Sequence, residues 1–520
     1  MSANRWLALI ALGALGLRLG LALLVTHPGI GDPTHYYNLG RELAAGRGFV
    51  IDYIWQYNDP PDDITHPDDH WMPLAGVLAA GGLALASGSA FAALLPFILL
   101  GTLLVPLAYD AARQLEVGAG GSLFAAAAAA VLPELVLNSL RTDTTIPNAA
   151  LVTTAVLLFN RGLRTGGLAA FAGSGLTAGL AYLTRSESTL LLAALAGAPL
   201  LRARWGSLPR QRWAGALLVP LVALLTAAPW LARNAQTLGY LTARETQYMY
   251  FFADQRDHYA YGQTFTLETL LARQTPAQIA GKRLFELAAG AKMMYNALDV
   301  FLPVAVIGGL ALLIAARDRQ RLLTLSPALL FVLAGWLFYA LLVPYKAQSG
   351  SFKKLYLSAV PLLLPLAGWA LARAISDARL RLGAAVIALA LTAANAVELV
   401  RADAAFTARY ADYIAQVVAA ARALPDTNGD GEIVLMAQDP FMINYFGLRA
   451  VMLPLADREG VLAVARRYNV DYMMMPPDRP ALDPLYAGGE QDPRFVPVVA
   501  IGGTNAALYG FDFDADTDQS

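Results

Sequence analysis

The chain has 520 residues, of which 57% are hydrophobic and only 15% are charged. An ordinary soluble domain carries about 25% charged residues, so a soluble fold of this length could not bury so much apolar surface, and a membrane protein is indicated. The net charge of -1 excludes a global electrostatic field for nucleic acid. The chain contains no cysteine, which excludes disulfides and thiolate chemistry.

Apolar stretches long enough to cross a membrane recur along the chain. A transmembrane helix needs about 20 apolar residues. The first stretch is too long for the apolar part of a signal peptide and lacks a small-residue cleavage site, so we interpret it as a retained span. The predicted spans are 6–26, 90–110, 119–139, 146–160, 213–230, 298–316, 322–343, 355–375 and 381–399, with two short spans in 167–201.

Basic residues in short loops predict the orientation, because cytoplasmic loops are rich in Lys and Arg. The strongest basic loops are 161–164, 202–212, 317–321 and 379–381. All of these loops, with Arg5 and Arg113, can lie on the cytoplasmic side only if the apolar stretch 73–88 does not cross the membrane. We therefore predict eleven spans, a juxtamembrane or re-entrant helix at 73–88, a cytoplasmic N-terminus and an external C-terminus.

The external segments are then 27–89, 140–145, 184–188, 231–297, 344–354 and 400–520, and they contain all five histidines. We expect a membrane domain at 1–399 with long external loops at 27–89 and 231–297. Residues 400–520 are expected to form a separate extracytoplasmic domain. The protein is predicted to sit in the cell membrane with its chemistry outside.

From about residue 401 the long apolar stretches end, and strands that alternate with helices indicate a small α/β domain. An amphipathic helix is predicted at 404–424 and a second helix at 461–468. Strands are predicted at 432–436, 451–453, 471–475, 495–501 and 506–511. The fold class is therefore an all-α membrane domain with a small α/β domain. The run 426–433 is similar to the start of a calcium loop, but Ala437 replaces the final Glu, so a polar turn is the alternative.

The first external loop holds the main candidate for chemistry. Asp32 comes a few residues after the first span, where a carboxylate can face both the membrane surface and water. A general base there could serve an aqueous acceptor while a lipid-linked donor lies in the bilayer. The alternative is that Asp32 is the N-cap of a helix over residues 34–45, since Asp is a preferred capping residue.

The spacing of Asp32, Tyr36, Leu43, Gly46 and Gly48 after the first span resembles the GT-C superfamily of membrane glycosyltransferases. The resemblance is closest to the branch of protein O-mannosyltransferases and aminoarabinose transferases. Further segments agree with it along nearly the whole chain. They are Leu132-Pro133 with Asn138, Ser139 and Asp143; GLAYLTR at 179–185; APWLARN at 228–234 followed by Gly239; KKLYLSAVP at 353–361; and the tail segments 441–454 and 466–475.

The resemblance implies an enzyme that moves a sugar from a polyprenyl-phosphate donor to an external acceptor, with inversion. It implies Asp32 as the catalytic base and Asp143 as a residue that orients the acceptor or helps bind a cation; for Asp143 a helix N-cap is the alternative. The acceptor is a protein, a lipid or a glycan. The implied phosphate ligands are Arg233, Lys354, Lys353 and Arg185, and the implied substrate contacts are Tyr36, His35 and Tyr345.

Several alternatives stay open at this point. Any one of these cations can instead be an interfacial side chain whose charge reaches water. Arg18 and Glu134 lie inside predicted spans, where ionisable groups are either functional or paired to shape the bundle. No cofactor is certain. One cluster of possible metal ligands has two interpretations, a divalent metal site and a surface loop. Its members are His35, His66, His70, Asp68 and Asp69. The competing functions are a transporter or lipid flippase and a non-catalytic scaffold. Membrane lipids are expected partners and nucleic acid is not.

Overall fold

The computed structural model describes residues 2–86, 88–205, 209–346 and 350–515. The chain forms two compact units. The unit that we call the membrane unit contains Met1–Thr26, Trp71–Leu241 and Ala277–Ala404. The unit that we call the sheet unit contains His27–His70, Thr242–Pro276 and Ala405–Ser520. Each unit therefore draws on separate parts of the sequence.

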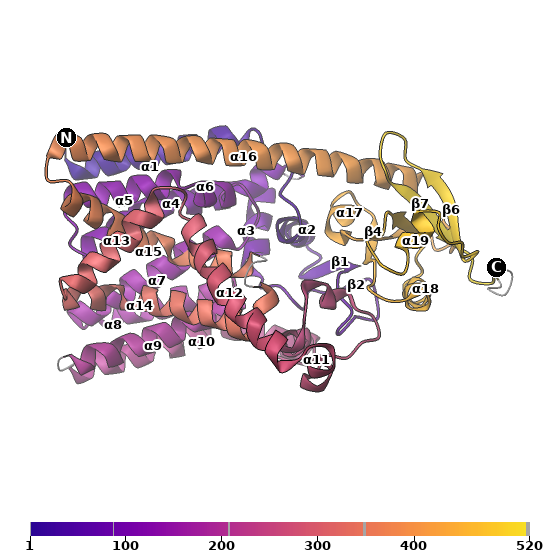
Figure 1. The fold of residues 1–520 in the computed structure, drawn as a ribbon, viewed down its shortest axis with the longest axis horizontal. Coiled ribbons are helices and arrows are strands. Elements are labelled where there is room, and N and C mark those ends of the chain that lie inside the picture. The colour runs from indigo at the N-terminus through magenta and orange to yellow at the C-terminus, as the bar shows by residue number, and fades with distance from the viewer. Residues whose placement is uncertain (1, 87, 206–208, 347–349, 516–520) are drawn as a thin grey trace. The chain divides into compact units, whose positions relative to one another are not determined.

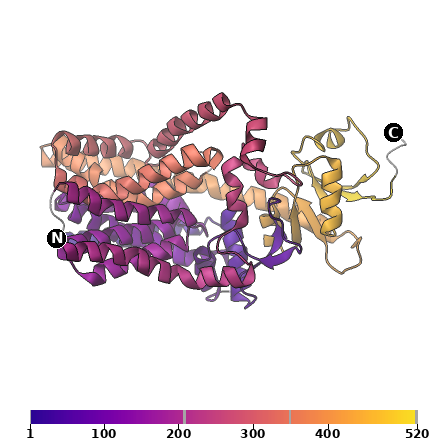
Figure 2. The ribbon, with the colours of Figure 1, turned by 90° about the horizontal axis from the view of Figure 1, so that it is seen from below.

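The membrane unit consists of helices that run alongside one another (Figure 1, Figure 2). They are α1 (Ala3–Ala22), α3 (Leu74–Leu83), α4 (Ala90–Gln114), α5 (Ala119–Val131), α6 (Pro133–Asn138), α7 (Thr145–Thr165), α8 (Leu168–Tyr182), η1 (Ser186–Ser188), α9 (Thr189–Arg204), α10 (Arg210–Thr237), α12 (Pro276–Asn296), α13 (Leu302–Ala315), α14 (Arg319–Leu337), η5 (Phe338–Leu342), η6 (Pro344–Lys346), α15 (Ser351–Ala374) and the first part of α16 (Ala378–Arg422).

Helix occupies most of each of the eleven predicted spans. Six helices in the described residues are long and apolar enough to cross a membrane by themselves: α1, α4, α10, α14 with its extension to Leu342, α15 and α16. Helix α3 has ten residues. At a rise of about 1.5 Å per residue it is much shorter than the hydrocarbon core of about 30 Å. This length agrees with the prediction that residues 73–88 do not cross.

The predicted span 119–139 is broken into α5 and α6, and the buried Arg18 stabilises the break. Pro133 lacks a backbone N–H and separates α5 from α6, so carbonyls at the end of α5 lose helical donors. Arg18, which is 0% exposed, supplies donors: its Nη1 lies 2.9 Å from the Ala130 carbonyl oxygen and its Nε lies 3.1 Å from Ser139 Oγ. A cation at a helix C-terminus also complements the helix dipole. The structure therefore supports the bundle-shaping role of Arg18.

Replacing this side chain tests that assignment. We expect Arg18→Leu to destabilise the protein by at least about 2 kcal/mol, because buried carbonyls lose a donor and each unsatisfied group costs roughly 1–3 kcal/mol. Thermal unfolding of the detergent-purified chain measures this loss. Arg5→Leu is the matched control, since Arg5 is an exposed residue of the same helix. Equal stabilities for the two variants would contradict the assignment.

The sheet unit is built around one seven-stranded sheet. Its elements are α2 (Asp32–Ala44), β1 (Val50–Ile54), β2 (Thr65–Pro67), η2 (Arg244–Gln247), η3 (Met249–Phe251), η4 (Gln255–Tyr259), α11 (Leu267–Arg273), the last part of α16, β3 (Val434–Ala437), α17 (Pro440–Tyr445), β4 (Arg449–Met452), α18 (Arg458–Arg467), β5 (Tyr472–Met475), α19 (Asp483–Tyr486), β6 (Phe495–Ala500) and β7 (Ala507–Phe511).

The strand order is β2-β1-β4-β3-β5-β7-β6. Strands β1, β4, β3 and β5 are parallel, with Leu435 opposite both Ala450 and Tyr472. The outer strands β2, β7 and β6 pair antiparallel. The five strands predicted in the C-terminal region are all present, and apolar residues of α18 such as Val461 and Leu462 pack on them. Two further strands, β1 and β2, come from residues 50–67, and the sequence did not predict them.

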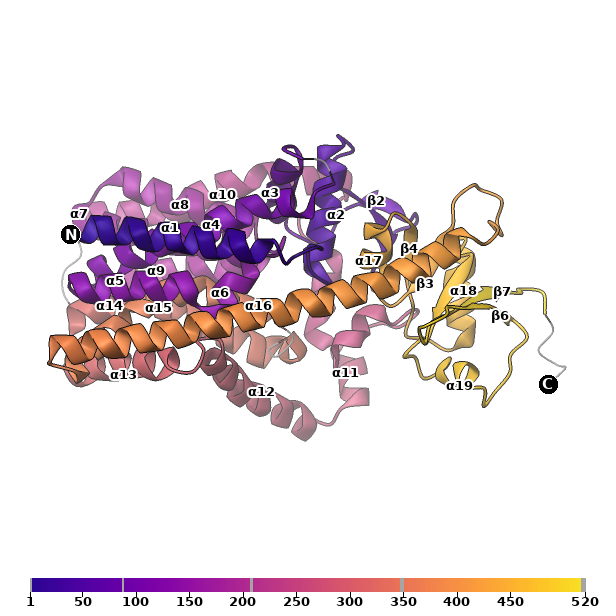
Figure 3. The same ribbon diagram turned by 90° about the horizontal axis from the view of Figure 1, so that it is seen from above.

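Helix α16 differs from the prediction of two helices separated near residue 400. It runs for 45 residues without a break (Figure 3). No glycine or proline occurs between Ala384 and Arg422, so nothing in the backbone ends the helix where the hydropathy falls. The loop after it is a polar turn, in which the Asp426 carboxylate accepts hydrogen bonds from the backbone N–H groups of Asn428, Gly429 and Gly431.

Candidate active site

Asp32 is the first residue of α2 in the sheet unit. Gly31 precedes it with φ of +73°, a conformation that glycine adopts without strain. Gly31 therefore occupies the N-cap position, and the interpretation of Asp32 as the N-cap is wrong. The Asp32 carboxylate lies in the first turn of the helix, where the helix dipole stabilises negative charge. Asp32 is partly exposed. A general base needs such exposure to reach the acceptor.

His35, one turn after Asp32, is fully buried in a polar chain. Its Nδ1 lies 2.5 Å from the hydroxyl of Tyr53, and its Nε2 lies 3.5 Å from Asp68 Oδ2. Burial, and then the negative charges of Asp68 and Asp32, raise the pKa of Tyr53 well above its usual value. Tyr53 is therefore a neutral phenol, and its hydroxyl and the Asp68 carboxylate lie on opposite sides of the His35 ring. Tyr36 is also buried, with its ring 4.9 Å from that of His35.

His66 and His70, which follow His35 in the sequence, have separate partners. His66 donates from Nδ1 to the Ile64 carbonyl oxygen at 2.9 Å, and burial lowers the pKa of its imidazole. His70 pairs with Glu245. Burial and the charge of Glu245 raise the pKa of Asp69 well above its usual value. Among the described residues, no group of three or more His, Asp or Glu side chains is placed to hold a metal ion.

Asp143 and Lys354 form a buried ion pair in the membrane unit. Lys354 Nζ lies 2.7 Å from Asp143 Oδ2, and the two side chains are 17% and 2% exposed. The other carboxylate oxygen accepts from Thr144 Oγ1 at 2.9 Å and from the backbone N–H of Thr145 at 3.2 Å. Asp143 thus accepts from the first residue of α7, but the N-cap position belongs to Thr144, so the N-cap alternative for Asp143 is wrong. Asp143 also holds the lysine at the start of α15.

Arg185 belongs to the same network. Its Nη1 donates to Thr144 Oγ1 at 2.9 Å, and its Nη2 pairs with Glu187, which also accepts from the Tyr339 hydroxyl. Glu187 and Tyr339 are residues that the sequence analysis did not single out. The carboxylate of Glu187 next to Arg185 in a short break between apolar helices was the available signal. The guanidinium is therefore fixed from η1, α7 and η5.

A chain of hydrogen bonds between neutral side chains also links η1, α7 and α15. Ser188 Oγ donates to Asn148 Oδ1 at 2.9 Å, Asn148 Nδ2 donates to Ser358 Oγ at 2.8 Å, and Ser358 Oγ donates to the Lys354 carbonyl oxygen at 3.0 Å. All three side chains are buried. Because each hydroxyl and amide has a partner, the chain fixes η1, α7 and α15 relative to one another. The lysine and the arginine therefore have defined positions.

The remaining predicted residues lie outside this network. Lys353 pairs with Glu134 at 2.9 Å, so Glu134 is paired internally. Arg233 lies with its guanidinium 4.8 Å from the Trp230 ring centre and donates to Asn234 Oδ1 at 3.0 Å. Tyr345 is a buried residue of η6. The structure thus brings together Asp143, Lys354 and Arg185 in the membrane unit, and Asp32, His35 and Tyr36 on one helix of the sheet unit.

Comparison with known proteins identifies the fold. Residues 65–232 match the model of the dolichyl-phosphate-mannose-protein mannosyltransferase family. The structure of ArnT from Cupriavidus metallidurans bound to undecaprenyl phosphate matches with a TM-score of 0.64 at 15% identity, over 99% of both chains. The chain has the GT-C glycosyltransferase fold. The oligosaccharyltransferase AglB from Archaeoglobus fulgidus, in complex with an inhibitory peptide and a dolichol-phosphate, matches with a TM-score of 0.57 at 14% identity, over 91% of this chain and 69% of that one.

A search of curated protein sequences finds no match to the chain. The fold class and the GT-C resemblance predicted from the sequence are both confirmed. The chain is an integral multi-pass membrane protein with a small C-terminal sheet region. At these identities the likeness to solved structures shows the fold, and the assignment of individual residues depends on the geometry described above.

Proposed function

We propose that this GT-C protein is a glycosyltransferase that moves a sugar from a polyprenyl-phosphate donor to an extracytoplasmic protein, lipid or glycan. The observation that carries the proposal is the end-to-end match, over 99% of both chains, with a structure that holds undecaprenyl phosphate. The mannosyltransferase family match over residues 65–232 supports the same chemistry. The sugar transferred is a hexose or a pentose.

Asp32 is the proposed catalytic base. An acceptor hydroxyl or amine attacks the anomeric carbon, its proton passes to the Asp32 carboxylate, and the bond from that carbon to the phosphate oxygen breaks with inversion. A positioned base of this kind contributes about 10²–10⁴ to the rate. Its place in the first turn of α2 favours the ionised form that accepts a proton. The buried His35 chain holds α2, so we assign His35 to positioning and Tyr36 to the substrate side of the same helix.

The departing phosphate gains negative charge, which fixed cations stabilise most effectively when they need not reorganise. Lys354 and Arg185 meet this requirement, because Asp143, Thr144 and Glu187 already hold them. Asp143 is therefore proposed to orient the lysine. Arg233, Lys353 and Tyr345 are proposed as further contacts to the donor.

The proposed topology places the N-terminus in the cytoplasm and the sheet unit outside. Its support is the concentration of arginines in the loops 161–164, 202–212, 317–321 and 379–381, which the positive-inside rule assigns to the cytoplasm. Residues 1–399 and 400–520 remain our proposed division into a membrane domain and an extracytoplasmic domain.

The donor can be identified in host membranes by mass spectrometry of polyprenyl-phosphate sugars. We expect one such lipid to accumulate when the gene is deleted, because its consumer is gone, and to return to its usual amount when the wild-type chain is restored. The accumulated species names the sugar. An unchanged lipid profile in the deletion strain would count against the proposed function.

A further inference from the structure

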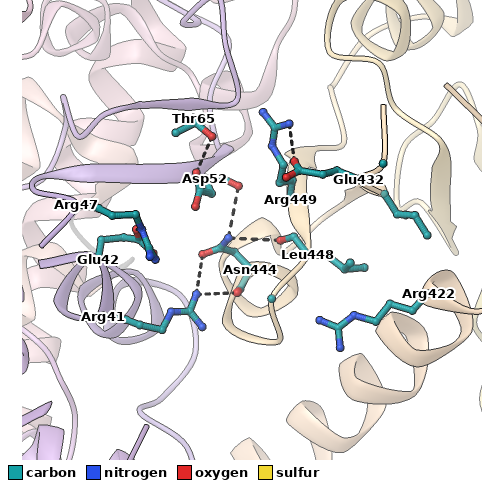
Figure 4. Close-up of a pocket in the computed structure, with 13 residues that line it drawn as sticks. Arg41, Glu42, Arg47, Asp52, Thr65, Arg422, Glu432, Asn444, Leu448 and Arg449 are labelled. Carbon is teal, nitrogen blue, oxygen red and sulfur yellow. Dashed lines mark hydrogen bonds and ion pairs between the residues drawn. The ribbon is translucent and has the colours of Figure 1, made fainter. Parts of the chain in front are cut away.

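A polar cavity of about 580 Å³ lies within the sheet unit (Figure 4). Its size falls within the range of roughly 300–1,000 Å³ that is typical of small-molecule sites. Of its thirteen lining residues, two are glycines and only Ile433 and Leu448 have apolar side chains. A ligand that binds by burying apolar surface does not suit this lining, whereas a ligand with many hydroxyl groups does.

Two arginines at the cavity form no ion pair with a carboxylate in the described part of the chain. Arg41 donates from Nη1 to the Tyr445 carbonyl oxygen and from Nη2 to the Asn444 carbonyl oxygen, both at 3.0 Å. Arg422 donates from Nη2 to the Phe446 carbonyl oxygen at 2.6 Å. Their charges therefore face the cavity with only the end of α17 as a partner. Figure 4 shows the two guanidinium groups reaching toward the same open space beside Asn444.

The rest of the lining alternates donors and acceptors. Arg47 pairs with Glu42, Arg449 Nη1 lies 2.9 Å from Glu432 Oε2, and Thr65 donates to Asp52 Oδ1 at 2.6 Å. Each pair presents a planar charged group and an oxygen side by side. Such pairs can exchange hydrogen bonds with neighbouring hydroxyls of a sugar ring, which are also donors and acceptors.

Gly447 lies beside the Arg422 guanidinium. A Cβ atom at this position would lie 3.0 Å from Arg422 Nη2, and the residue has φ of +83°, which other residues rarely adopt. A larger residue at 447 would therefore displace the guanidinium. The sequence and the fold both leave Arg422 accessible from the cavity.

The geometry points to a binding site for an acidic saccharide in the sheet unit, with the carboxylate of the sugar between Arg41 and Arg422 and its hydroxyls on the flanking pairs. Arginine suits this task because its planar fork binds a carboxylate through two parallel hydrogen bonds. The site is separate from the residues proposed for sugar transfer. It therefore stands whether or not the chain is a transferase.

Isothermal titration of the full-length protein in detergent tests the site with trigalacturonic acid. The trimethyl ester of the same trisaccharide is the matched probe, since it keeps the ring hydroxyls and lacks the charge. We expect the acid to bind and the ester to bind at least about tenfold more weakly, because a charge-assisted hydrogen bond is lost. Equal binding of acid and ester, or no binding of the acid, would overturn the proposal.

Variants locate the binding. Arg422→Gln and Arg41→Gln are each expected to weaken binding of the acid at least about tenfold. Arg422→Gln is the safer variant for folding, because Arg422 makes a single hydrogen bond whereas Arg41 braces two carbonyls. Arg409→Gln, an exposed arginine of the same helix α16 outside the cavity, is the control and should bind as the wild type does. Unchanged affinity in Arg422→Gln would refute the site. So would triglutamate or inorganic phosphate displacing the saccharide at equal concentration, because the cavity would then recognise anions and not sugars.

Discussion

Asp32→Asn is expected to abolish sugar transfer while the protein still folds. The amide has nearly the same shape as the carboxylate but cannot accept the acceptor's proton, so the loss should be about 10²–10⁴ in rate. In the mass-spectrometric assay, the rescue with Asp32→Asn should accumulate the same polyprenyl-phosphate sugar as the deletion strain. In vitro, turnover of the purified variant with that lipid measures the loss directly.

The control for this variant is Asp62→Asn. Asp62 lies in the same external loop, its side chain is 99% exposed, and its partner is Arg467 on the surface. Surface ion pairs contribute little, so the control should fold and turn over as the wild type does. Wild-type turnover in Asp32→Asn would remove Asp32 from the role of base. An equal loss in both variants would point to a general effect of charge in the loop.

Hydropathy and local periodicity were enough to predict helix in the eleven apolar stretches and the five strands of the C-terminal region. They did not predict α12, α17 or α19, and they divided α16 in two. That the helix at 74–83 does not cross the membrane stays a prediction, which rests on the count of basic loops. The break at Pro133 was not predicted, although proline inside an apolar stretch signals it. The strand pairing of residues 50–67 with β4 was not predictable either, because pairing across nearly 400 residues leaves no local signal.

The candidate site was only partly predictable for the same reason. Asp143, Lys354 and Arg185 were expected as separate residues, and the sequence carried no sign that the first two pair directly. Glu187 and Tyr339 were missed because each looks ordinary in its own segment. Their role depends on a contact across 152 residues. Buried polar networks are specified by packing, which a single sequence does not display.

The ion pair between Asp143 and Lys354 allows stability and catalysis to be separated. We expect Lys354→Gln alone to destabilise the protein by about 3–5 kcal/mol, because it removes the lysine from a carboxylate that is 2% exposed. Asp143→Asn with Lys354→Gln should recover most of this loss, since two amides can hydrogen-bond without a buried charge. The double variant should still be strongly impaired, because the phosphate loses one of its two fixed cations and Arg185 alone remains. Thermal unfolding and turnover measure the two effects.

The matched control for stability is the pair of Glu134 and Lys353, the residue next to Lys354 in α15, with Glu134→Gln and Lys353→Gln. Lys353 is 37% exposed, so water screens the pair and either single change should cost at most about 1 kcal/mol. Full activity in the Asp143→Asn, Lys354→Gln double variant would remove Lys354 from the phosphate site and leave the pair a purely structural role. A stable but strongly impaired double variant would instead show that the buried carboxylate serves to hold the lysine, and that the lysine is needed for the reaction itself.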